Sequence, residues 1–175
     1  CLRAWVTACD NLLDDELKEL IKTDLPENAK IFKSVHTLLL TDRIFYSFLS
    51  DAVKEKVISD QEMNLLLVDS LRSISISGIE EAQEECGVDY GISPEKVLGE
   101  VHYAKTGRLF TSPLAAPLSL NDIDPMSQKT QNIQKGLILL GVGCQILDDL
   151  SDLGADIYHR KHNYLAALIF HGDSS

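Results

Sequence analysis

The chain has 175 residues, a formal net charge of −11 and 45% hydrophobic residues. This length is enough for one domain with a real core, and the composition is typical of an ordered globular protein. The acidic balance argues against nucleic-acid binding, because neutralising phosphates requires a basic face and no basic residues cluster here. No run of about 18 apolar residues occurs and no signal-peptide pattern is present, so we expect neither a membrane-spanning helix nor a secretory leader.

The cysteines give no sign of a metal site or a disulfide framework. They lie at Cys1, Cys9, Cys86 and Cys144, without a C-x-x-C spacing. Two of them fall inside apolar helical patterns, where a thiol usually acts as a small hydrophobic group. A reduced, cytoplasmic compartment is therefore expected.

The hydrophobic pattern has a helical period, and no alternating pattern of convincing length predicts a strand. Helices are expected, in chain order, from about Leu2 to Lys22, Glu27 to Val57, Ser59 to Cys86, Ser93 to Phe110, Asp124 into the acidic stretch that ends at Asp152, and Asn163 to Phe170. Pro26 marks the end of the first helix, and Pro113 and Pro117 are expected to break the fourth. We predict an all-α bundle that forms a single domain over residues 1–175.

Two of these helices carry start signals. Ser59 and Glu62 have the spacing of a capping box, in which each side chain bonds the other residue's backbone N–H. Ser93 followed by Pro94 places a preferred N-cap residue before a proline at the first helical position. The third and fourth helices should therefore begin at these residues.

Three carboxylates end the apolar run of residues 136–144, at Asp148, Asp149 and Asp152. On a helix Asp148 and Asp152 share a face, and Asp149 lies about 100° round the same turn. Stacked carboxylates repel each other, more strongly where water is scarce. A cation between them would relieve this repulsion.

A second acidic stretch lies near the start of the chain and also follows apolar residues. Asp10 and Asp14 are separated by four positions, with Asn11 between them. Facing carboxylates of this kind suit Mg²⁺, which takes one or two carboxylates per ion and completes its shell with water and substrate phosphates. The pattern predicts several Mg²⁺ ions and a diphosphate ligand, although a pair of solvated acidic helix ends is the simpler alternative.

At these residues the chain resembles the class I isoprenoid synthases, most closely the trans-prenyltransferases that build polyprenyl diphosphates. That family has two motifs of pattern D-D-x-x-D, the second preceded by Gln, with a Lys-Thr pair between them. Here the second motif is intact at Asp148–Asp152, preceded by Gln145, and the pair is Lys105–Thr106. The first motif, Asp10–Asp14, has Asn11 at its second position.

The resemblance implies an antiparallel helix bundle of the isoprenoid-synthase type, here without the family's N- and C-terminal helices, and a homodimer. It implies metal ligation by Asp10, Asn11, Asp14, Asp148, Asp149 and Asp152. It implies substrate binding by Lys105, Thr106, Arg108, Gln145 and Lys161, and catalytic roles for Asp10, Asp14, Lys105 and Asp148. For the basic residues, a solvated surface charge is the alternative.

The implied reaction is Mg²⁺-dependent prenyl transfer from an allylic diphosphate to isopentenyl diphosphate. The acids would hold the cations at the rim of an apolar cavity that keeps water from the allylic cation. Two other readings stay open. The basic pair that usually follows the first motif is absent, which leaves room for a terpene cyclase or a head-to-head condensing synthase. Asn11 leaves room for a non-catalytic partner subunit or an inactive remnant.

Overall fold

The computed structural model describes residues 2–13, 18–84, 87–88, 92–120 and 123–172. Every regular element in these residues is helical and none is a strand, so the predicted all-α class is confirmed. No helix in the described part of the chain is long and apolar enough to cross a membrane.

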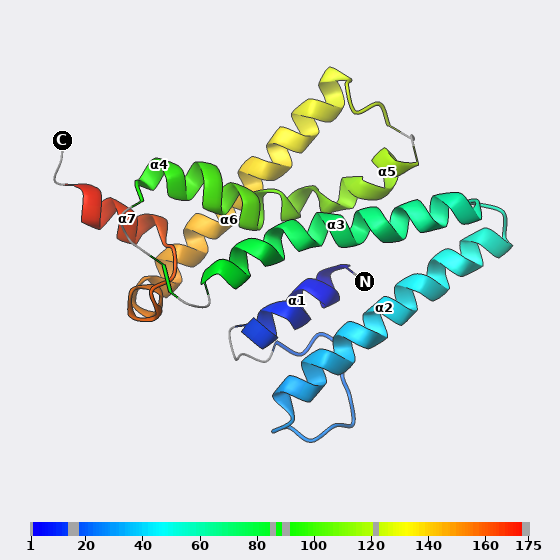
Figure 1. Ribbon diagram of the computed structural model, residues 1–175, viewed down its shortest axis with the longest axis horizontal. Helices are drawn as coiled ribbons and strands as arrows, with labels where there is room; N and C mark the ends of the chain where they lie inside the picture. The colour runs from blue at the N-terminus through cyan, green and yellow to red at the C-terminus, as the bar shows by residue number, and fades with distance from the viewer. Residues whose placement is uncertain (1, 14–17, 85–86, 89–91, 121–122, 173–175) are drawn as a thin grey trace. The chain divides into compact units, whose positions relative to one another are not determined.

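The helices are shown in Figure 1. They are α1 (Leu2–Leu13), α2 (Lys30–Lys54), α3 (Asp60–Glu84), α4 (Pro94–Lys96), the π-helix η1 (Val97–Gly107), the 3₁₀ helix η2 (Leu109–Leu114), α5 (Ala115–Ser119), α6 (Gln128–His159) and α7 (Tyr164–His171). The chain divides into two compact units, Cys1–Leu67 and Val68–Ser175, and α3 runs through the division. Each unit is described by itself, and both the single domain and the isoprenoid-synthase bundle stay predictions.

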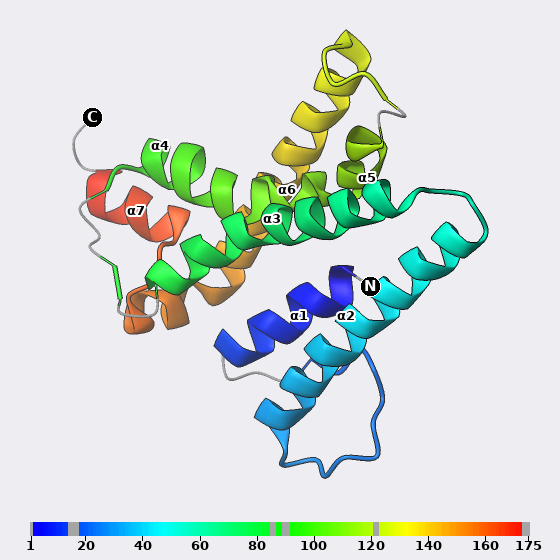
Figure 2. The ribbon, with the colours of Figure 1, turned by 45° about the vertical axis from the view of Figure 1, so that its right-hand side comes forward.

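In the first unit α1 packs against α2, and the two helices run in opposite directions (Figures 1 and 2). Ala8 of α1 and Leu49 of α2 are buried. The predicted extension of the first helix to Lys22 is wrong, because residues 18–29 are not helical. The Asn11 amide accepts from the Lys18 backbone N–H and donates to the Lys18 carbonyl, and such side-chain bonds compete with continued helix.

The second unit is organised around α6, which packs against η1, η2 and α7. Its most buried side chains are polar as well as apolar: Val97, His102, Asp149 and Asn163 are each no more than 2% exposed. A polar centre of this kind must be hydrogen-bonded to be stable. The candidate site is built on these bonds.

The helix starts predicted at Ser59 and Ser93 are confirmed, whereas the helix predicted from Asp124 begins at Gln128 and the one predicted from Glu27 begins at Lys30. Ser59 and Glu62 form the capping box, with the Ser59 backbone N–H donating to the Glu62 carboxylate at 2.7 Å and the Glu62 N–H to Ser59 Oγ at 3.2 Å. Ser93 accepts from the Lys96 N–H ahead of α4. After one turn, however, the fourth helix continues as the π-helix η1, a form often found at functional sites.

Candidate functional site

Two glycines let the backbones of η1 and α6 come close together. A Cβ on Gly141 of α6 would lie 2.7 Å from the Thr106 carbonyl oxygen and 3.0 Å from the Gly107 Cα. A Cβ on Gly107 would lie 3.1 Å from Val142 Cγ2. At Gly141 the nearest atoms are backbone atoms, which cannot turn away, so a glycine there allows the close crossing that brings the Lys-Thr pair near the second acidic motif.

A chain of hydrogen bonds joins these helices across 39 positions of sequence. Thr106 Oγ1 donates to Gln145 Oε1. Gln145 Nε2 donates to Asp149 Oδ1 at 3.2 Å and lies 3.5 Å from Asp148 Oδ2, at the outer limit of a hydrogen bond. The residues predicted to bind substrate, Thr106 and Gln145, therefore contact each other and the second motif.

Asp149 points into the protein and not toward the other acids of its motif. It is 1% exposed, and its Oδ2 accepts from His102 Nε2 at 2.7 Å and from the Tyr164 N–H at 2.6 Å. Burial by itself raises the pKa of Asp149, but the bonds from His102, Tyr164 and Gln145 outweigh burial and hold that pKa below its ordinary value. The carboxylate predicted as a metal ligand thus has both oxygens engaged by protein donors.

Asp148 and Asp152 are exposed and lie one turn apart on α6. They have the arrangement expected of ligands that share a cation with water and a phosphate. Asp156 lies one turn further on and is half-buried. Within the described residues, no group of three or more His, Cys, Asp or Glu side chains is arranged to hold a metal by itself.

Lys105 is held by a buried carboxylate. Its Nζ donates to Glu84 Oε2 at 3.2 Å, and the other oxygen of Glu84 lies 3.3 Å from His162 Nδ1. Glu84 is 4% exposed. Burial lowers the pKa of His162, and the neighbouring His102 and Lys105 lower it further. At neutral pH His162 is therefore uncharged and donates Nδ1–H to the Glu84 carboxylate.

The other basic residues lie apart from this cluster. Arg108 is exposed and follows η1 directly, with its backbone N–H bonded to the Tyr103 carbonyl. Arg160 adopts the left-handed conformation after α6, and its guanidinium donates to the Val88 carbonyl at 3.3 Å. Lys161 follows it, and its charge partly offsets the rise that burial causes in the pKa of Asp156.

Asn163 joins α6 to the start of α7. Its Oδ1 caps α7 by accepting from the backbone N–H of Leu165 and Ala166, each at 3.0 Å. Its Nδ2 donates to the Asp149 carbonyl at 2.7 Å and to Asp156 Oδ2 at 2.8 Å. This single 2% exposed side chain therefore fixes the turn that carries Lys161.

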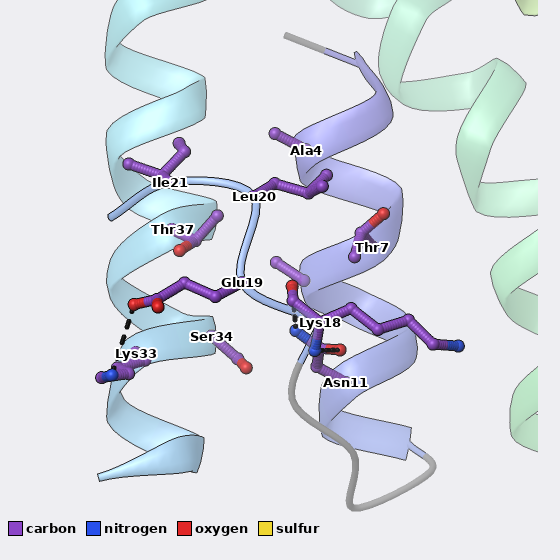
Figure 3. Close-up of a pocket in the computed structure, with 11 residues that line it drawn as sticks. Ala4, Thr7, Asn11, Lys18, Glu19, Leu20, Ile21, Lys33, Ser34 and Thr37 are labelled. Carbon is purple, nitrogen blue, oxygen red and sulfur yellow. Dashed lines mark hydrogen bonds and ion pairs between the residues drawn. The ribbon is translucent and has the colours of Figure 1, made fainter. Parts of the chain in front are cut away.

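The first motif lies in the other unit, and the structure gives part of it a different use. Asn11, predicted as a metal ligand, is 7% exposed and bonds the Lys18 backbone through both ends of its amide (Figure 3). It lines a small pocket between α1 and α2, beside the buried Lys33, whose Nζ lies 3.3 Å from Glu19 Oε1. The Asp10 side chain and all of Asp14 lie outside the described residues.

The stability of the folded chain is expected to fall as the pH drops below 6.5, the ordinary value for histidine. The pKa of His162 is lowered in the folded state, so between that lowered value and 6.5 the unfolded chain binds more protons and acid favours unfolding. The pKa of Asp149 is also lowered in the folded state, so this residue makes the stability fall further as the pH drops below 3.8, the ordinary value for aspartate. Asp156, whose pKa burial raises, acts in the opposite direction above 3.8.

Urea unfolding at pH 7 and pH 5.5 measures this slope. His162→Gln should reduce it, because glutamine keeps a donor for Glu84 but does not titrate. An unchanged slope in that variant would contradict the assignment of the acid sensitivity to His162.

Several residues of the site were not predicted from the sequence. They are His102, Glu84 and His162. The side-chain bonds of Asp156 and Asn163 were not predicted either. One signal existed for His102, which precedes Thr106 by four positions and so falls near it on a helix. For Asn163, a capping residue at the start of the last helix was visible, but its bonds to α6 were not.

In the second unit, η1 and α6 thus bring the Thr106 hydroxyl and the Gln145 amide together beside Asp148 and Asp149, with Asp152 one turn further along α6. Lys105 adjoins Thr106 in sequence, and its ammonium is bonded to Glu84 of α3. Such groups can orient a phosphate and the cation that accompanies it. Comparison with known proteins adds no further identification, since no family model, curated protein or solved structure matches the chain.

Proposed function

We propose that the chain is a Mg²⁺-dependent prenyltransferase of the class I isoprenoid-synthase type, which condenses an allylic diphosphate with isopentenyl diphosphate. The observation that supports this most directly is the bond between Thr106 and Gln145, which joins the Lys-Thr pair to the second acidic motif.

The residues that would hold Mg²⁺ in this unit are Asp148 and Asp152, because they are exposed while Asp149 is engaged inside the protein. They fit an ion that takes one or two carboxylates and leaves room for water and diphosphate oxygens. When bound, Mg²⁺ would neutralise the charge that develops on the departing diphosphate. Asp10 and Asp14 stay predicted ligands for further ions.

The chain's own residues would orient and neutralise the diphosphate. Lys105 supplies a fixed positive charge, and Thr106 a hydroxyl beside it. Gln145, with its carbonyl bonded to Thr106, holds its amide against the second motif. After the C–O bond of the allylic diphosphate breaks, the double bond of isopentenyl diphosphate attacks the allylic carbon, and a proton leaves to the diphosphate.

Asn11 favours a second candidate, a non-catalytic partner subunit or inactive remnant. Both ends of its amide are bonded to the Lys18 backbone, so the second position of the first motif has a structural use. The head-to-head synthase and terpene cyclase remain alternatives that use the same ionisation without isopentenyl diphosphate. The dimer stays a prediction that light scattering can test.

Product analysis with Mg²⁺ separates these functions. Geranyl or farnesyl diphosphate should give elongated prenyl diphosphates only when isopentenyl diphosphate is present. Hydrocarbon products in its absence would indicate a cyclase, and bound Mg²⁺-pyrophosphate without turnover would indicate a partner subunit.

Asp148→Asn is expected to lower turnover by about 100-fold or more, because it removes a charge that holds the cation at the developing negative charge. The control is Glu100→Gln, which removes an exposed carboxylate from η1. That variant should keep turnover within about threefold. An equal loss in both variants would show that general charge, and not the second motif, determines activity.

A further inference from the structure

The contact between His102 and Asp149 is the most deeply buried polar contact described in the second unit. Both side chains are 1% exposed, and His102 Nε2 lies 2.7 Å from Asp149 Oδ2. Apolar side chains of similar volume often stabilise such a position as well or better. A buried pair of this kind therefore calls for a role other than stability.

The bonds of Asp149 determine what that role can be. One oxygen accepts from His102 and from the Tyr164 N–H, so the carboxylate cannot turn about its last torsion without breaking both bonds. The other oxygen then has a fixed place, where it accepts from Gln145 Nε2 at 3.2 Å. His102 thus acts on Gln145 through Asp149.

Both ends of the Gln145 amide contact residues of the proposed diphosphate site. Its Oε1 accepts from Thr106, and its Nε2 lies 3.5 Å from Asp148 Oδ2. An ionised carboxylate can only accept, so Asp149 determines which end of the amide points toward Thr106. The orientation of Gln145, Thr106 and Asp148 therefore depends on His102, which acts on them through Asp149.

His102 Nδ1 is buried without a hydrogen-bond partner among the described residues. A buried ring nitrogen that no partner satisfies is unfavourable in a protein interior in either protonation state. The imidazole is then useful at this position for its Nε2–H alone. Glutamine offers a similar donor at similar reach, whereas phenylalanine fills the space without one.

We propose that His102 is a positioning residue of the diphosphate site, which holds Gln145 and Asp148 in place through Asp149. The expected effect of His102 on diphosphate binding rests on the proposed function. The coupling of His102 to Gln145 through Asp149 does not depend on that function. Direct hydrogen-bond partners of metal ligands typically change affinity or activity by about 10–100-fold when removed. Because His102 reaches the proposed ligand Asp148 only through Asp149 and Gln145, a change of about tenfold is expected here.

The test compares His102→Phe and His102→Gln in the full chain. The first measurement is the ¹H–¹⁵N signals of the Gln145 side-chain amide, assigned with Gln145→Glu. We expect them to move toward the values of a freely rotating amide in His102→Phe and to stay in place in His102→Gln. Unchanged signals in His102→Phe would overturn the proposal whatever the chain binds.

The second measurement is Mg²⁺-dependent binding of inorganic pyrophosphate by calorimetry. We expect His102→Phe to weaken it by about tenfold and His102→Gln by less than about threefold. A purely structural role would lower the urea midpoint and leave the affinity unchanged, which would overturn the proposal. Should His102→Phe fail to fold, His102→Asn, which is too short to reach Asp149, takes its place in both measurements.

The two proposals fail in different ways. If the wild-type chain does not bind Mg²⁺-pyrophosphate, the proposed function and the role of His102 in that site are both overturned, even where the Gln145 signals respond. If the wild-type chain binds it and His102→Phe binds it equally well, only the positioning role is overturned.

Discussion

Gly141→Ala is expected to destabilise the second unit by about 2–3 kcal/mol, the range in which extra atoms at a tightly packed position usually fall. The added Cβ would lie 2.7 Å from the Thr106 carbonyl oxygen and 3.0 Å from the Gly107 Cα. Both are backbone atoms, so no side chain can turn away and the two helices must separate. The measurement is the free energy of unfolding in urea.

Gly143 and Gly136 lie on the same helix and provide matched controls. A Cβ at either position meets no atom within 4 Å. Alanine there should stabilise the helix by up to about 1 kcal/mol, because glycine has the lower helix propensity. Equal losses for Gly141→Ala and Gly143→Ala would show that helix flexibility, and not the close crossing with η1, makes glycine necessary.

The close crossing of η1 and α6 also affects the proposed diphosphate site. Separation of the helices would lengthen the bond between Thr106 and Gln145, so Gly141→Ala should also weaken Mg²⁺-pyrophosphate binding in the fraction of chains that stay folded. Gly143→Ala should leave it unchanged.

The parts of the fold that could be predicted are those determined by local chemistry. The capping box of Ser59 and Glu62 and the N-cap at Ser93 need only neighbouring residues, and both occur as predicted. The end of the first helix could not be predicted in the same way. It depends on Asn11 bonding the backbone of Lys18, and the sequence shows an asparagine but not the partner of its amide.

The fourth predicted helix ends at Gly107, before both prolines, but the prolines do not end helical structure. Pro113 lies in the 3₁₀ helix η2, and Pro117 is the third residue of α5. Pro117 lies in the first turn of α5, where the backbone N–H groups have no intrahelical partner in any case, so the proline loses no bond there. The chain therefore stays helical through both positions by beginning a new helix and not by continuing the old one.

The sequence also could not show which acid of the second motif points inward. Helical spacing places Asp149 on a different face from Asp148 and Asp152, but it does not say which face meets the core. That choice depends on His102, 47 positions away, and on the Tyr164 N–H. The acidic pattern and the Lys-Thr pair could be found from sequence, whereas the buried partners that orient them could not.

Lys105→Met is expected to lower the stability of the second unit by about 2–4 kcal/mol and to weaken Mg²⁺-pyrophosphate binding at least tenfold. The stability loss comes from Glu84, which is 4% exposed and would lose the ammonium at 3.2 Å that neutralises its charge. Methionine keeps the length of the side chain, so the packing changes little. Urea unfolding and calorimetry with pyrophosphate measure the two effects separately.

Adding Glu84→Gln to the Lys105→Met chain separates the role of Lys105 in stability from its proposed role in pyrophosphate binding. Because glutamine carries no charge, the double variant leaves no buried carboxylate without its ammonium, and most of the lost stability should return. Pyrophosphate binding should not return, since the positive charge that would meet the diphosphate is still absent. Recovery of binding together with stability would mean that Lys105 supports the fold alone, and the diphosphate would then have to be held by other residues.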